Sequence, residues 1–242
     1  MTAIDINTTI GQLVADRPSR SRLFESLGID YCCGGKQPLA DACQKHGLDA
    51  NTVAKLLSAT EQQVGRETSR DWTQAPLTEL ADHIEQTHHA YLRRELPRLT
   101  AMVDKVANVH GQSYGWLISL RNVFNGFVPE LNAHMLKEER VLFPMIRQLE
   151  AGEADAANHC GGLSNPIRMM EHEHDQAGDA LAKMRELTAD FTPPEGACNT
   201  FRAMLDGLAE LEHDMHLHVH KENSILFPRA SELEVRQQGT AA

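Results

Sequence analysis

The chain has little of what defines several protein classes. It contains no apolar run near the roughly 20 residues of a membrane-spanning helix, and residues 1–12 are too polar for a secretion signal. Basic residues are outnumbered, and the formal net charge of −11 argues against nucleic acid as the main partner. The five cysteines are odd in number and irregularly spaced, unlike a secreted disulfide framework. We therefore expect a cytoplasmic protein that binds neither membranes nor nucleic acid.

Alternating β-branched runs are also nearly absent, while long segments follow the helical period of 3.6 residues. The sequence predicts an all-α fold with a small helical domain in residues 1–60, a linker in 61–75 and an antiparallel four-helix bundle in 76–235. The bundle helices are expected near 76–109, 113–149, 166–188 and from 198 to beyond 219, separated by loops rich in glycine and proline. Pro97 and Pro129 fall inside two of these helices and are expected to kink them.

The chain does contain an internal repeat. Residues 134–144 (HMLKEERVLFP) and 218–228 (HVHKENSILFP) lie 84 positions apart and share His, Lys, Glu, Leu, Phe and Pro at the same offsets. In each copy the His and the Glu, His134 with Glu138 and His218 with Glu222, lie one helical turn apart. Each pair falls on the apolar stripe of its helix, where Val141 and its counterpart Ile225 are also expected. Burying an imidazole with a carboxylate is unfavourable without a partner, and a metal ion supplies one.

The other two bundle helices carry histidines at a similar offset. His174 lies on the apolar stripe of its helix, and the residue 85 positions earlier is His89. Periodicity alone does not separate His89 from His88, and His83 is a further candidate, but the repeat offset favours His89. Three other histidines of the last helix lie off its stripe: His213, His216 and His220.

Four imidazoles and two carboxylates suit two iron or manganese ions bridged by the carboxylates and a water-derived oxygen. Ferritin-like sites use more Glu than His, so this set predicts a more neutral centre, open to small diatomic ligands. A structural zinc site is disfavoured, because it takes about four ligands and prefers thiolates. Glu130 and Glu173 lie close to His134 and His174 in sequence. Each is either a hydrogen-bond partner of a ligand, or a proton or iron relay, or an exposed charge.

Residues 31–37 (YCCGGKQ) contain two adjacent cysteines, Cys32 and Cys33. A disulfide between neighbours is strained. The glycines, Lys36 and a helix beginning near Pro38 are expected to lower the pKa of a thiol and to expose it. A reactive or iron-handling role therefore stands beside the alternative of two small buried residues. The remaining cysteines have no partner pattern: Cys43, Cys160 and Cys198.

The combination of these motifs resembles the Repair of Iron Centres family. The resemblance rests on residues 31–37, on the two His-x-x-x-Glu…Leu-Phe-Pro motifs and on residues 173–175 (EHD), and it extends from about residue 9 to 229. It implies a hemerythrin-like di-iron bundle preceded by a small cysteine-bearing domain, with a functional role for both adjacent cysteines. The iron ligands it implies are His89, His134, Glu138, His174, His218 and Glu222, with the two glutamates bridging. Pro129 departs from the expected pattern.

The family implies a stress protein that restores iron-sulfur clusters damaged by nitric oxide or peroxide, by delivering iron to the damaged proteins. An alternative is a nitric oxide reductase that forms nitrous oxide at the di-iron site. It would need an external reductase, because the chain has no flavin or nicotinamide fingerprint. A third function is a carrier or sensor of oxygen or nitric oxide. The sequence separates neither iron donor from enzyme nor monomer from homodimer.

Overall fold

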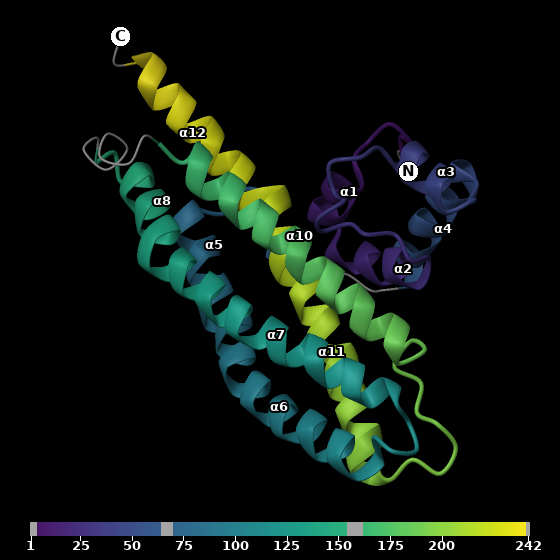
Figure 1. The fold of residues 1–242 in the computed structure, drawn as a ribbon. Helices are drawn as coiled ribbons and strands as arrows, with labels where there is room; N and C mark the ends of the chain where they lie inside the picture. The colour runs from purple at the N-terminus through teal and green to yellow at the C-terminus, as the bar shows by residue number, and fades with distance from the viewer. Residues whose placement is uncertain (1–3, 64–69, 154–161, 241–242) are drawn as a thin grey trace. The chain divides into compact units, whose positions relative to one another are not determined.

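The computed structural model describes residues 4–63, 70–153 and 162–240, and within these ranges it is helical and contains no β-strand (Figure 1). This confirms the predicted all-α fold. The chain divides into two compact units, one made of residues 1–80 with 216–242 and the other of residues 81–215. The predicted linker, 61–75, includes residues 64–69, which lie outside the described ranges, and the predicted domain boundaries stay a prediction. None of the described helices is long and apolar enough to cross a membrane.

The unit of residues 81–215 is a four-helix bundle. Its main helices are α6 (Ala90–His110), α7 (Trp116–Lys137), α10 (Ser164–Leu187) and the part of α11 (Asn199–Lys221) that ends at Met215. Helix α7 packs along both α6 and α10. Helix α11 is held against α6 by Gly207, where an added Cβ would lie 2.7 Å from Leu99. It is held against α10 by ion pairing between Arg185 and Glu212. These helices agree closely with the predicted segments.

Three of the long helices are interrupted by a five-residue π-helical turn. These turns are η2 (Glu85–His89), between α5 (Leu77–Ile84) and α6; η3 (Glu138–Leu142), between α7 and α8 (Phe143–Glu150); and η4 (Glu222–Leu226), between α11 and α12 (Phe227–Thr240). The two interior prolines lie inside continuous helices, and the expected kinks stay a prediction. Helices α6 and α7 continue through Pro97 and Pro129 without a break in their α-helical structure.

The unit of residues 1–80 and 216–242 contains the amino-terminal helices and the last part of the chain. The amino-terminal helices are α1 (Ile10–Asp16), η1 (Pro18–Arg20), α2 (Ser21–Ser26), α3 (Leu39–Lys45) and α4 (Ala50–Gln63). Thr9 begins α1 by accepting a hydrogen bond from the backbone N–H of Gln12. The helices share an apolar core that includes Phe24, Tyr31 and Cys43, and α1 also packs against η4.

Candidate metal centre

Each π turn carries one or more of the predicted ligands. In η3 the N–H of Phe143 donates to the carbonyl of Glu138, five residues earlier, and in η4 Phe227 donates to Glu222 in the same way. Proline follows directly in both copies, at Pro144 and Pro228. Because proline has no N–H and its ring crowds the carbonyl four residues before it, a wider turn relieves the clash. The Leu-Phe-Pro motif is therefore a signal for the bulge that periodicity alone does not reveal.

The π turn in η3 changes which residues face inward, and one expectation was wrong for this reason. An extra residue rotates the following helix by about 100° relative to the α-helical register. Leu142 takes the buried position, with 1% exposure, while Val141, predicted on the apolar stripe, is 48% exposed. In η2 the same effect buries both His88 and His89.

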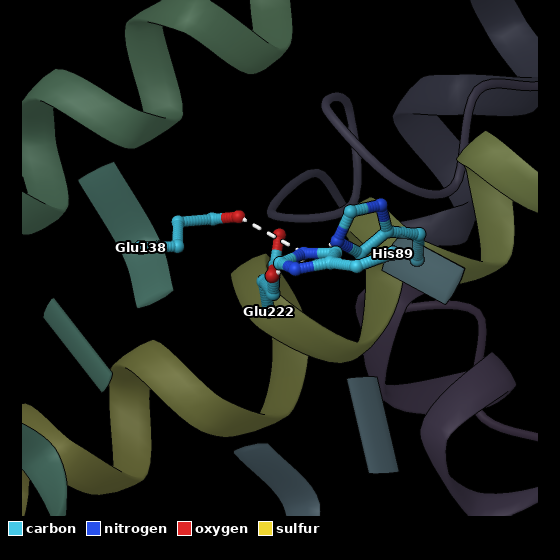
Figure 2. A group of neighbouring side chains, drawn as sticks. His89, Glu138 and Glu222 are labelled. Carbon is cyan, nitrogen blue, oxygen red and sulfur yellow. Dashed lines mark hydrogen bonds and ion pairs between the residues drawn. The ribbon is translucent and has the colours of Figure 1, made fainter. Parts of the chain in front are cut away.

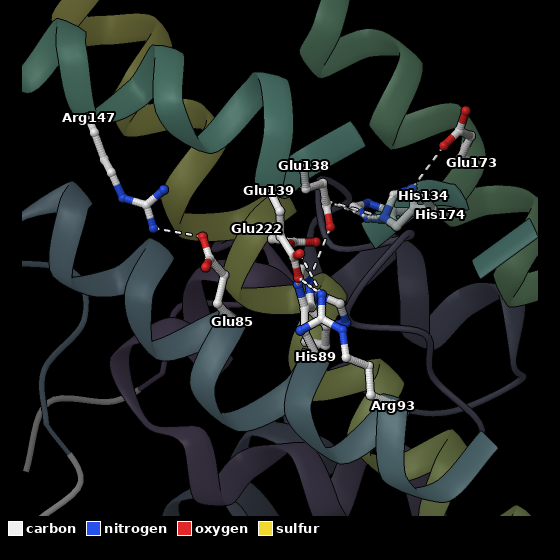
Figure 3. Close-up of polar contacts among 11 residues, drawn as sticks. Glu85, His89, Arg93, His134, Glu138, Glu139, Arg147, Glu173, His174 and Glu222 are labelled. Atoms are coloured by element: carbon white, nitrogen blue, oxygen red, sulfur yellow. Dashed lines mark hydrogen bonds and ion pairs between the residues drawn. The ribbon is translucent and has the colours of Figure 1, made fainter. Parts of the chain in front are cut away.

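Glu138 is the centre of a buried cluster in residues 81–215. Its Oε2 lies 3.3 Å from Nε2 of His89, and its Oε1 lies 3.2 Å from Nε2 of His134 and 3.9 Å from Nε2 of His174 (Figure 2; Figure 3). All four residues are buried, with at most 4% of their surface exposed. The two oxygens of one carboxylate thus face different imidazoles, which is the arrangement of a carboxylate that bridges two metal ions.

The spacing of the imidazoles also fits a metal. The Nε2 atoms of His134 and His174 are 3.0 Å apart. Two nitrogens bound at right angles to one ion at about 2.1 Å each would be separated by about 3.0 Å. His134, Glu138 and His174 each bring one ligand atom within 4.8 Å of the others. These buried histidines and glutamate are compatible with an iron centre.

Two further carboxylates hold the outer nitrogens of these imidazoles. Nδ1 of His134 donates to Oε2 of Glu173 at 2.9 Å, and Nδ1 of His89 donates to Oε1 of Glu139 at 2.7 Å (Figure 3). Such contacts fix the ring orientation and leave Nε2 available to a metal. The sequence analysis named Glu173 as a candidate hydrogen-bond partner of a ligand, but it did not identify Glu139. Glu139 adjoins the ligand Glu138, and the π turn directs the two side chains to the two nitrogens of one imidazole.

Basic residues keep these outer carboxylates ionised. Lys137 binds Glu173, and Arg93 binds Glu139. Burial raises the pKa of each carboxyl, but the hydrogen bonds and charges of the basic residue and of the imidazole outweigh burial. The pKa of Glu139 and that of Glu173 are therefore both below the ordinary value for a glutamate.

The second copy of the repeat reproduces the local geometry of the first, within residues 216–242. Nε2 of His218 lies 3.1 Å from Oε1 of Glu222, against 3.2 Å for the equivalent atoms of His134 and Glu138. Both His218 and Glu222 are fully buried. The repeat in sequence is therefore a repeat in structure.

The remaining candidates differ in their surroundings. Nδ1 of His88 lies 2.9 Å from Oδ1 of Asp214, and its ring contacts that of His83, so these histidines belong to a separate polar cluster. Glu130 is exposed and lines a cavity of about 200 Å³ whose wall also includes His134 and His174. No described hydrogen bond joins it to a predicted ligand, and its role as a relay stays a prediction.

The adjacent cysteines differ from expectation. Cys32 is buried, with 5% exposure, and Cys33 is half-buried. The hydrogen bond with Cys33, burial and the nearby Asp30 carboxylate hold the pKa of Cys32 well above its ordinary value. The pKa was expected to be lowered, and this was wrong because the sequence does not reveal that the Asp30 carboxylate lies 3.1 Å from Sγ of Cys32. Of the other cysteines, Cys43 is in the core, Cys198 is exposed, and Cys160 lies outside the described residues.

Comparisons with known proteins agree with this geometry. The family model for the hemerythrin HHE cation binding domain matches residues 80–230, and the model of the ScdA_N domain, described as a domain of unknown function, matches residues 6–61. Relatives from Yersinia pseudotuberculosis serotype IB (strain PB1/+) and Yersinia pestis (strain Pestoides F) are each 40% identical over 224 residues. The match covers 93% of this chain and 96% of each relative, and both are named iron-sulfur cluster repair protein YtfE. The resemblance seen in the sequence is thereby confirmed, and the chain belongs to the YtfE family of iron-sulfur cluster repair proteins, with a hemerythrin-like domain.

Proposed function

We propose that six side chains hold two iron ions in this chain. They are His89, His134, Glu138, His174, His218 and Glu222, the set that the sequence repeat and the family resemblance imply, with the two glutamates as the bridging ligands. The observation that carries the proposal is the carboxylate of Glu138, whose two oxygens face the imidazoles of two different helices. The equivalence of Glu222 in the repeat supports the second bridge. A bound ion would offset the unfavourable burial of two carboxylates.

We infer further that the chain repairs iron-sulfur clusters damaged by nitrosative or oxidative stress, and that it does so as an iron donor. Its clients would be the damaged iron-sulfur proteins. Neutral imidazoles and bridging carboxylates bind ferrous iron less tightly than a thiolate cage does, so iron can leave for a cysteine-lined cluster site. The name of the relatives, iron-sulfur cluster repair protein, supports this function.

The test is an anaerobic transfer experiment with the reduced, iron-loaded protein and an iron-sulfur enzyme whose cluster has been nitrosylated. Client activity should recover in proportion to the iron lost from this protein. The matched variant is Glu138→Gln, which keeps the volume of the side chain but removes the bridging charge. It should hold at most about half of the parent's iron and deliver correspondingly less. Client recovery that is equal with the variant would contradict the donor function.

A second candidate, reduction of nitric oxide to nitrous oxide, is favoured by one observation. The cavity of about 200 Å³ beside His134 and His174 can admit a diatomic molecule to that side of the centre. The same protein is therefore given excess nitric oxide and a reductant, and nitrous oxide is counted per di-iron centre. At most one turnover agrees with an iron donor. Many turnovers, with iron retained and no client recovery, would make the chain a reductase.

A further inference from the structure

The loop between α2 and α3 is organised around a single carboxylate. Oδ1 of Asp30 accepts hydrogen bonds from the backbone N–H groups of Cys32, at 2.9 Å, and Cys33, at 3.0 Å. Its Oδ2 accepts one from the N–H of Gly34, at 2.9 Å. The loop is therefore turned so that both thiols lie on the side of the carboxylate, and Sγ of Cys32 is 3.1 Å from Oδ1.

The two thiols are separated by a distance that suits a shared metal. Their Sγ atoms are 3.9 Å apart, and neither cysteine forms a disulfide. A disulfide requires about 2.05 Å between the sulfurs. Two thiolates bound to one tetrahedral ion at about 2.3 Å each lie about 3.8 Å apart. Asp30, Cys32 and Cys33 each bring one ligand atom within 4.8 Å of the others.

We propose that Asp30, Cys32 and Cys33 form a second metal site, a mononuclear site for a thiophilic divalent transition metal such as ferrous iron. Two thiolates and one carboxylate supply three ligands, and the metal displaces the thiol protons when it binds. The fourth position stays open to water or to a ligand from another protein. An incomplete ligand set of this kind suits transient binding, whereas a structural site is closed by four protein ligands. The site rests on the loop alone and does not depend on the repair function.

The loop is packed against the turn that carries Glu222, within residues 1–80 and 216–242. A Cβ added at Gly35 would lie 3.2 Å from Oγ of Ser224 in η4, so the absence of a side chain permits this approach. The ring of Tyr31, which precedes the cysteines, lies edge-on to that of His220, with 5.6 Å between ring centroids. A metal held by the loop would thus be bound on the part of the chain that also presents His218 and Glu222.

The experiment uses full-length protein whose bundle has first been loaded with ferric iron, so that added metal reports on the remaining sites. Cobalt(II) is titrated anaerobically into the reduced thiols, and the thiolate-to-cobalt charge-transfer absorption is read as a difference from the iron-loaded protein. We expect saturation at about one equivalent, as one tetrahedral site requires. The absorption should disappear in Cys32→Ser and in Cys33→Ser. The control, Cys198→Ser, removes an exposed cysteine elsewhere and should leave it unchanged.

Asp30→Asn tests whether Asp30 binds the metal or only organises the loop. The amide oxygen of asparagine still accepts the backbone hydrogen bonds, but it binds metal poorly. We expect cobalt affinity to fall about ten-fold or more while the circular dichroism spectrum stays that of the parent. Any of three results would overturn the site. They are unchanged cobalt affinity in Asp30→Asn, absence of a sulfur-to-cobalt absorption band in the parent, and loss of that band in Cys198→Ser. Cobalt binding by the loop in a protein that repairs no client would uphold the site and reject the repair function.

Discussion

The two copies of the repeat agree where they hold ligands and differ where they face outward. The distance from His Nε2 to Glu Oε1 is 3.2 Å in one copy and 3.1 Å in the other, and a π turn begins at each Glu. Leu136 and Val141 of the first copy are 43% and 48% exposed. Their counterparts in the second copy, His220 and Ile225, are each 4% exposed.

The difference arises because the outer face of the second copy packs against the amino-terminal segment. We call this surface, which includes His220 and Ser224, the docking face. Arg140 of the first copy corresponds to Ser224 of the second, a small residue that meets Gly11 and Gly35. The edge of Tyr31 covers His220 in the same way. The inner face of both copies has the same ligand geometry, whereas only the outer face of the second copy packs against the amino-terminal segment.

The largest expected effect tests the agreement between the copies. Glu138→Ala and Glu222→Ala should each abolish the bridged centre, so that bound iron per chain falls by at least about half. Iron quantified after anaerobic loading and desalting measures the loss. The control is Glu232→Gln, a side chain that is 66% exposed. Loss of iron in only one of the two alanine variants would show that the copies are not equivalent as metal ligands.

Packing at the docking face can be disrupted by a substitution at Gly11, where an added Cβ would lie 2.6 Å from Oγ of Ser224. Gly11→Ala should lower the free energy of unfolding by about 1–3 kcal/mol through overpacking. Urea denaturation measures it, and Ser224→Gly in the same chain should restore part of the loss. Gly126→Ala is the matched control, because a Cβ there meets nothing within 4 Å and should be neutral or stabilising. Equal effects at both glycines would remove the argument for a tight interface.

Acid should expose a further difference between the copies. Burial lowers the pKa of His220 from 6.5 to about 4, and a hydrogen bond to the backbone of Tyr31 raises it by a smaller amount. The first copy has Leu136 at the equivalent position, which does not titrate. A histidine whose folded pKa is depressed contributes stability that is complete above its unfolded pKa and lost as pH falls from 6.5 toward 4. For this histidine, the loss in metal-free protein should be about 2 kcal/mol at about pH 5.

His220→Leu, which copies the first repeat, should remove that part of the acid sensitivity. The measurement is the free energy of unfolding in urea, compared between neutral and acidic buffer for parent and variant. His172→Leu, at an exposed histidine of α10, should change the pH dependence little. The same slope in His220→Leu as in the parent would mean that His220 is not buried in the neutral form.

The smallest expected effect concerns the carboxylates that orient the imidazoles of the bundle. Glu173→Gln and Glu139→Gln keep a hydrogen-bond acceptor beside His134 and His89 but lose the charge. Iron affinity should fall about 10–100-fold in each. Competition with a ferrous chelator measures it, with Glu186→Gln as the control at a side chain that is 70% exposed. Unaltered affinity would limit these glutamates to a packing role.

The inner faces of the helices could be predicted because they obey simple periodicity. His174, His134 and Glu138 lie on apolar stripes, and burial of polar groups on a stripe is itself informative. The outcome for Val141 and Glu139 could not be predicted in this way, because a π turn changes the register by one residue. The turn forms because the following proline has no N–H and crowds the carbonyl four residues before it. In the sequence, only the Leu-Phe-Pro motif signals this turn.

Contacts between segments distant in sequence were the other limit. The burial of His220 depends on Tyr31, about 190 residues earlier, and no local pattern connects the two. Likewise, the environment of Cys32 depends on the rotamer of Asp30, which directs its carboxylate toward the thiol. In the sequence, the nearby Lys36 suggested a lowered pKa. The sequence does not show that the Asp30 carboxylate contacts the thiol and raises its pKa instead.

The π turns also restrict how this chain can change over evolution. Each turn is one residue longer than the α-helical segment it replaces. Deleting one residue within 138–142 would restore regular winding but rotate everything downstream by about 100°. Phe143, Ile146 and Leu149, which are now buried, would then turn away from the core. A substitution in this segment changes one side chain, whereas a change in length turns a whole helix face. We therefore expect the number of residues between the glutamate and the proline to be more constrained than most of the side chains between them.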